Sequence, residues 1–396
     1  MAAHGHGPED GGSLTITPHM RHVVMAVLVP LVLATVAGIV LFWPSGEHPT
    51  IEGAERYNGT VLDVRECADL PDPQCREASV RVDSGPDEGL EVVVPVPYGA
   101  GAPDFNSGDA VVMYGNQDWP IEDRYSVDDF QRSTPLALLA VLFAAAVVAL
   151  SRWRGVAALA GLALSVLVLM IFILPALLEG TSPLAVAVVG ASAIMMITLY
   201  LAHGFSMKTS VALIGTVVSL SLTGLLGYGF TYFANFVGIV DENVSHLGGV
   251  AEAIDLRGLL LAGLVIGALG VLDDVTVSQA STVWELARAN PLAGRRYLVG
   301  AGLRVGRDHV AATVNTLVLA YAGASLPLLL LFTVADRPVL EIVTMEVVAQ
   351  EVVRALVGSI GIVAAVPVTT ALAAVTVREA TRRTRGRRAV RTTEVS

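Results

Sequence analysis

Two adjacent carboxylates, Asp273 and Asp274, lie inside a long apolar stretch of this chain. A charged side chain costs roughly 2.5–3.5 kcal/mol at the centre of a membrane-spanning helix, so an acid at that depth is by default a functional-site hypothesis. Removal of a carboxylate from water penalises its charged form, which suits proton coupling. Carboxylate oxygens also suit cations such as Mg²⁺ or Mn²⁺. The pair therefore indicates a site for a proton or a cation.

Helical spacing separates the two acids. Asp274 continues a stripe of residues spaced by three or four positions, whereas Asp273 points about 100° away from it. Small residues in the stripe allow a second helix to approach closely, and the polar ones follow Asp274 along the chain. Asp274 is therefore expected to be the binding carboxylate. The stripe consists of Gly263, Gly267, Gly270, Asp274, Ser278, Ser281 and Glu285.

The depth of the acids has two interpretations. Either the span ends at Leu272 and the acids lie among the lipid head groups, or the segment is half-buried or re-entrant and lines a cavity. Apolar residues continue as far as Leu286, which favours the cavity. The next apolar segment brings further polar groups, which are expected beside Asp274. The binding candidates are Asp273, Asp274, Ser278, Glu285, Asp308, His309 and Asn315, with no catalytic residue and with any metal unspecified.

The elements that must position these residues are membrane helices. Hydrophobic residues make up 54% of the chain and charged ones 15%, which excludes an ordinary soluble domain. Basic residues gather in alternate loops and in the tail, which predicts both termini on the cytoplasmic side. An all-α bundle of about eight transmembrane helices is expected, at 23–43, 136–151, 155–174, 183–202, 209–233, 258–278, 310–333 and 351–377.

The domain boundaries follow from the same pattern. A disordered cytoplasmic arm at 1–22 and an anchor at 23–43 precede an acidic extracytoplasmic domain at 44–134, a seven-helix domain at 135–377 and a basic cytoplasmic tail at 378–396. Short strands with turn signals predict a small, OB-like β-barrel at 55–116. Its role is a cap, an oligomerisation module or a negative field that concentrates cations. Cys67 and Cys75 form a disulfide there, or remain two free thiols.

The residues around the acids match a known pattern. The stretch Ile254–Gly263, then Gly267–Gln279, Trp284–Leu286 and Val305–His309, strongly resembles the YibE/F family of bacterial polytopic membrane proteins. The resemblance covers roughly 136–377. It implies a multi-pass protein of the bacterial cell membrane, in a family described as predicted membrane proteins or permeases without a settled substrate. It supplies no mechanism.

The function expected from these observations is a transporter or permease of an unidentified solute, coupled to protons or cations through the intramembrane carboxylates. The alternative is a non-transporting sensor or assembly subunit. An intramembrane enzyme is less favoured, because the signatures of aspartyl proteases and lipid phosphotransferases are missing. No cofactor is predicted, although a bound cation is compatible with the site. The expected partners are the lipid bilayer and a small solute or ion, without nucleic acid, and a homo-oligomer is compatible with the sequence.

Overall fold

The protein consists of two compact units, one spanning residues 50–155 and the other combining 1–49 with 156–396. The computed structural model describes residues 18–46, 55–67, 75–97, 101–238, 254–335 and 337–391, with backbone only for 378–391. Most of the sequence-based disordered arm, at 1–17, and the end of the basic tail lie outside these ranges. Within them, α1 already begins at Pro18, and the last helix continues to Arg391.

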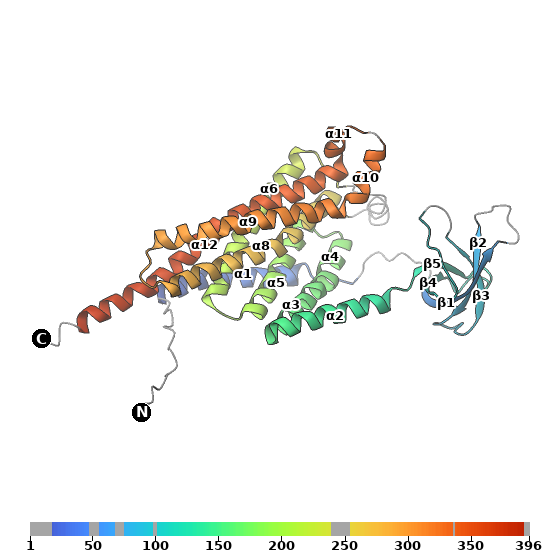
Figure 1. Ribbon diagram of the computed structural model, residues 1–396, viewed down its shortest axis with the longest axis horizontal. Helices are drawn as coiled ribbons and strands as arrows, with labels where there is room; N and C mark the ends of the chain where they lie inside the picture. Colours follow the sequence, from blue (N-terminus) through green and yellow to red (C-terminus); the bar gives the residue numbers. More distant parts are fainter. Residues whose placement is uncertain are drawn as a thin grey trace, which may run out of the picture. The chain divides into compact units, whose positions relative to one another are not determined.

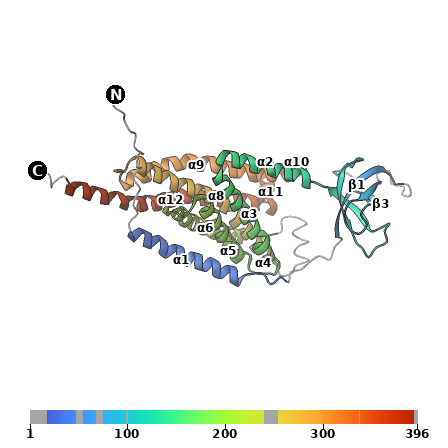
Figure 2. The same ribbon diagram turned by 90° about the horizontal axis from the view of Figure 1, so that it is seen from below.

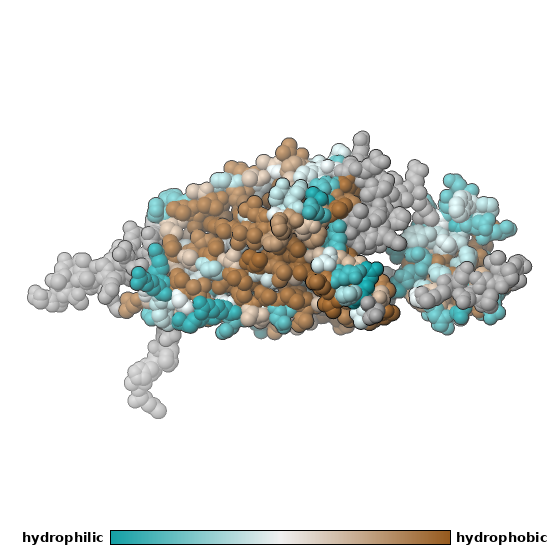
Figure 3. Space-filling model, turned by 90° about the horizontal axis from the view of Figure 1, so that it is seen from above, coloured by the Kyte–Doolittle hydropathy of each residue, from teal (hydrophilic) through white to brown (hydrophobic). Residues whose placement is uncertain are grey.

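The larger unit is helical, and its long helices α6, α8, α9 and α12 run alongside one another (Figure 1, Figure 2). A broad hydrophobic surface separates hydrophilic groups on the face seen in Figure 3. The helices are α1 (Pro18–Leu41), α3 (Trp153–Val168), α4 (Leu174–Leu178), α5 (Pro183–His203), α6 (Met207–Phe233), α8 (Leu256–Ala289), α9 (Arg295–Ala324), α10 (Leu326–Val334), α11 (Val339–Thr344) and α12 (Glu346–Arg391).

Seven helices among the described residues are long and apolar enough to cross a membrane. An eighth span results if α9 and α10, which meet at a bend of 58°, count as one. These helices indicate a multi-pass membrane protein. The third span carries a π-helical turn, η1 (Leu169–Ile173), between α3 and α4. Pro175 lies just beyond it, and the missing N–H and bulky ring of a proline explain such a local widening.

The core of this unit depends on an interlock between α6 and α12. An added Cβ at Gly215 of α6 would overlap the hydroxyl of Thr369 on α12. The relation is repeated in reverse, because a Cβ at Gly361 of α12 would overlap the hydroxyl of Thr223 on α6. Rising numbers on one helix therefore meet falling numbers on the other, so the two helices are antiparallel. Only glycine permits this close approach.

Helix α8 completes the core with buried polar bonds. Its Thr276 hydroxyl lies 2.6 Å from the hydroxyl of Thr216 on α6. The amide nitrogen of Gln279 donates to the Gly302 carbonyl of α9 at 2.8 Å and to the Thr370 hydroxyl of α12 at 2.7 Å. Gln279 is only 3% exposed, so these bonds replace the water that its amide nitrogen lost. One side of α8 is thus fixed against three neighbouring helices.

The smaller unit contains a curled, antiparallel five-stranded sheet in the order β3-β2-β1-β4-β5, followed by α2 (Ser133–Ser151). It is a half-barrel, because β3 and β5 remain edges in place of the closed barrel expected from the sequence. The fifth strand was not predicted. The strands are β1 (Glu55–Glu66), β2 (Arg76–Val82), β3 (Glu91–Val96), β4 (Ala110–Gly115) and β5 (Tyr125–Phe130).

Local features explain the curl of this sheet. A Cβ at Gly59 of β1 would lie only 2.7 Å from a Val80 methyl group and 2.8 Å from that of Met113, so glycine lets two core side chains close over the strand. Register shifts between Val61 and Asp63 add a local twist. A disulfide joins Cys67 to the residue before β2, Cys75.

Candidate functional site

Helix α8 runs without a break through both carboxylates. It contains 34 residues, about 51 Å at 1.5 Å per residue, which exceeds the ~30 Å hydrocarbon layer. The segment around Asp273 was expected to be half-buried or re-entrant, and the re-entrant alternative is wrong, because the polar residues beyond Asp273 belong to the same continuous helix. Because the helix is regular, Asp273 and Asp274 point in directions about 100° apart and meet different neighbours.

Asp273 faces α5 and is poorly compensated. The hydroxyl of Thr198 on α5 lies 3.5 Å from Asp273 Oδ2, at the limit of a hydrogen bond. The same hydroxyl lies 2.9 Å from the Ile194 carbonyl and 3.2 Å from that of Met195, and it has one proton to donate. Asp273 Oδ1 is buried and has no hydrogen-bond partner among the described residues. A proton or a cation would satisfy this oxygen.

Asp274 faces α9, and 74% of its side chain is exposed. Its Oδ2 lies 4.0 Å from Nε2 of His309, which is 38% exposed. That separation exceeds a direct hydrogen bond, and a water or small ion commonly bridges polar groups at such a distance. Nε2 of His309 is itself buried without a hydrogen-bond partner in the described part of the chain. The two groups thus face each other with unused capacity for binding.

The glycine stripe leads from Asp274 toward the beginning of α8 and is exposed along its length. A Cβ at Gly263 would lie 3.9 Å from the Arg354 guanidinium, and one at Gly267 would lie 3.4 Å from the Tyr321 hydroxyl. Nothing lies within 4 Å of a Cβ at Gly270. The close helix contact expected at these glycines is therefore not formed. They leave room beside long polar side chains instead.

An ion pair lies at the far end of this stripe, on α12. Arg354 Nη1 donates to Glu351 Oε1 at 2.6 Å, and both side chains are only about a fifth exposed, at 23% and 22%. The guanidinium also lies 5.9 Å from the centre of the Tyr321 ring on α9. Arg354 Nε is buried and lacks a hydrogen bond among the described residues. Polar groups thus occur at both ends of the exposed glycine stripe. We call this stripe, which consists of Gly263, Gly267, Gly270 and Asp274, the α8–α9 face.

The other predicted residues do not join this arrangement. Glu285 is exposed and pairs with Arg288 on its own helix at 2.8 Å. Ser278 is half-buried, and Asp308 and Asn315 are exposed. Among the described residues, no hydrogen bond or ion pair links any of these four side chains to Asp274 or His309, and no group of three or more His, Cys, Asp or Glu could hold a metal. Any cation would therefore have to be held partly by hydroxyls, carbonyls or water.

Sequence reasoning missed several residues of the site. Thr198 gave little signal, because a single threonine in an apolar helix is ordinary. Glu351 and Arg354 gave a clear one, since both charges fall inside a predicted span. Tyr321 also lies in such a segment, and only the packing of α9 against α12 brings it to the glycine face.

The fold and the site define a class: a multi-pass helical membrane protein with a half-barrel domain and acids in a central helix. Residues 139–379 match the model of the family described as YibE/F-like protein. The chain belongs to this family. No curated protein matches the chain, and no solved structure matches it.

Proposed function

We propose that this protein is a transporter or permease for a small solute, coupled to a proton or cation bound at Asp273 and Asp274. The observation that carries the proposal is that two polar atoms beside this part of α8, Asp273 Oδ1 and His309 Nε2, are buried without a hydrogen-bond partner among the described residues. Asp273 has a buried oxygen without a partner, and Asp274 stands 4.0 Å from a histidine. Acids within a membrane helix carry a high energetic cost and are typical of ion and substrate pathways.

The two carboxylates have different roles in this proposal. Asp273, held between α5 and α8, exchanges a proton or cation when the two helices move. Asp274 and His309 form the open part of the site, which the solute or its water approaches along the α8–α9 face. We further propose that the protein lies in the bacterial cell membrane with both termini in the cytoplasm, as the arginine distribution predicts. The half-barrel domain then lies outside the cytoplasm.

A flux measurement tests this proposal. The purified protein is reconstituted into liposomes, and proton movement under an imposed membrane potential and ⁵⁴Mn²⁺ uptake are recorded beside protein-free liposomes. We expect at least one of these fluxes, its loss in Asp273→Asn, and a reduction of about tenfold or more in Asp274→Asn. Glu285→Gln is the matched control, because Glu285 is exposed on the same helix and paired with Arg288.

Absence of both fluxes in the wild-type protein would contradict the proposal, as would full flux in a folded Asp273→Asn variant. Either result would favour the alternative of a non-transporting sensor or assembly subunit. Monodispersity in detergent, compared with the wild-type protein, shows that each variant is folded.

A further inference from the structure

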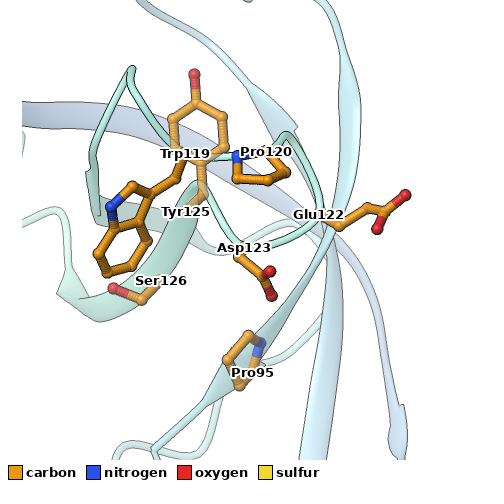
Figure 4. A pocket seen from close by; sticks show the side chains of 7 residues that line it. All are labelled: Pro95, Trp119, Pro120, Glu122, Asp123, Tyr125 and Ser126. Atoms are coloured by element: carbon orange, nitrogen blue, oxygen red, sulfur yellow. The ribbon is translucent and has the colours of Figure 1, made fainter.

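The half-barrel carries a pocket that the proposed transport function does not use. The pocket opens between the two edge strands, β3 and β5, beside the loop that joins β4 to β5 (Figure 4). Its volume is about 590 Å³. Pro95 on β3 and Trp119 and Pro120 on the loop supply apolar surface, while Glu122 and Asp123 supply carboxylates. The pocket thus combines apolar walls with negative charge, the usual elements of a small-molecule site.

The loop that forms this pocket is held in place by its own cation. Arg124 Nε and Nη2 each lie 3.2 Å from the Trp119 carbonyl, and Nη1 donates to Asp87 at 2.6 Å. The Tyr125 hydroxyl donates to the same Asp87 oxygen at 2.7 Å. This hydroxyl and the Arg124 guanidinium lower the pKa of Asp87, and burial together with Asp87 raises the pKa of Tyr125 to about 12. The pocket wall is therefore preorganised.

The same contacts leave the acids of the pocket unneutralised. Arg124 is turned toward Asp87, and no basic residue lines the pocket. In the described part of the chain, no ion pair engages Glu122 or Asp123, whereas other acids of this domain pair with Arg65, Arg76 or Arg81. Both side chains are exposed, and Figure 4 shows Asp123 extending toward Pro95 and Glu122 extending away from Trp119. Negative charge without a protein counter-ion attracts a cation from solution.

Trp119 indicates what kind of cation fits. Its side chain is 55% exposed and therefore accessible to a ligand. Indole is also the aromatic ring that attracts cations most strongly. A hydrated metal ion gains little from an indole face and two prolines. An organic cation, in contrast, places its charge near the carboxylates and its hydrocarbon part against Trp119, Pro95 and Pro120.

We propose that this pocket binds organic cations, namely an ammonium or guanidinium group attached to an apolar stem. Such a group is presented by a free amine or by a lysine or arginine side chain of a peptide. The proposal stands independently of the membrane site, because every residue in it belongs to the half-barrel unit.

Ligand-observed NMR on the full-length protein in detergent tests this proposal. The probes are agmatine, a free guanidinium compound, and the capped peptide acetyl-Gly-Arg-Gly-amide, with butylurea as a neutral analogue. We expect saturable binding of one or both cationic probes and none of butylurea. Binding of the peptide alone identifies a peptide segment as the source, and binding of agmatine alone identifies a free amine.

Variants place the binding in the pocket. Trp119→Ala is expected to weaken it about two- to fivefold, the change that corresponds to a cation–π contact at an exposed site. The double variant Glu122→Gln with Asp123→Asn is expected to weaken it about tenfold, and more at low salt than at high salt. The control Glu66→Gln with Glu88→Gln removes two exposed acids outside the pocket and leaves binding unchanged.

Three results would overturn the proposal. They are no saturable binding of either cationic probe, equal binding of butylurea, and unchanged affinity in the double variant of the pocket. Because these measurements concern binding alone, their failure is distinguishable from a failure of membrane flux.

Discussion

The two faces of α8 treat polar groups in opposite ways. On one face, Gln279 and Thr276 are buried, and their hydrogen bonds to α6, α9 and α12 are short. On the other, the α8–α9 face, Asp274 stands 4.0 Å from His309, and a Cβ at Gly270 would have nothing within 4 Å. Satisfied polar groups stabilise a fold, whereas unsatisfied ones cost stability and persist where function needs them. The comparison indicates a structural role for the first face, and in the function proposed above the second face handles the solute.

The largest expected effect distinguishes a glycine of the packed helix core, Gly361 on α12, from a glycine of the α8–α9 face, Gly270. Gly361→Val forces a side chain into the Thr223 hydroxyl and is expected to cost about 3 kcal/mol, because the overpacked helices must move apart. Gly270→Val meets nothing within 4 Å and should leave the fold intact. Thermal denaturation followed by size-exclusion chromatography compares the two. Equal melting temperatures would remove the basis of the comparison.

A smaller effect is expected for the hydrogen bonds on the first face of α8, the structural face, which carries Gln279 and Thr276. Gln279→Leu removes the hydrogen bonds that the Gly302 carbonyl and the Thr370 hydroxyl accept from Gln279. The loss of these two bonds is expected to cost about 1–2 kcal/mol. Ser278→Ala is the matched control, since Ser278 is half-buried next to Gln279 on the same helix. Stability is measured as for the glycine variants. A Gln279→Leu variant as stable as the control would show that these bonds are not structural.

The smallest effect is expected at the C-terminal end of α8, where Glu285 is an exposed surface charge. Glu285 and Arg288 are both more than half exposed, so Glu285→Gln should change the free energy of unfolding by less than about 0.5 kcal/mol. The same stability measurement at low and high salt checks this. A larger loss would mean that Glu285 belongs to the site after all.

The sequence predicted the long apolar helices better than the contacts between them. Long apolar runs identify spans directly, and the spans expected at 183–202 and 209–233 nearly coincide with α5 and α6. Strand β5 was missed because Asp128 and Asp129 make it read as a loop, although β4 pairs with it. The helix through Asp273 was expected to be half-buried or re-entrant, because polar residues on one side of it suggested a cavity.

The site was harder to predict, for a physical reason. Helical spacing separated Asp273 from Asp274 correctly, since it depends only on local geometry. The surroundings of each acid depend on residues far along the chain, such as Thr198 for Asp273. A glycine stripe has the same appearance whether it meets a helix or open space. The close contact expected at Gly263 and Gly267 therefore proved wrong, while the glycines that interlock helices, Gly215 and Gly361, gave no distinct signal.

The central claim is that the α8–α9 face lines a water-filled path and does not face lipid. Single cysteines at Gly270 and, on the structural face, at Val275 test it most directly, because the described part of the chain has no free thiol. Membrane vesicles are treated with a charged, membrane-impermeant methanethiosulfonate or with lipid-soluble N-ethylmaleimide. The account predicts that Gly270→Cys reacts with the charged reagent and Val275→Cys does not. Reaction of Gly270→Cys with N-ethylmaleimide alone would contradict it.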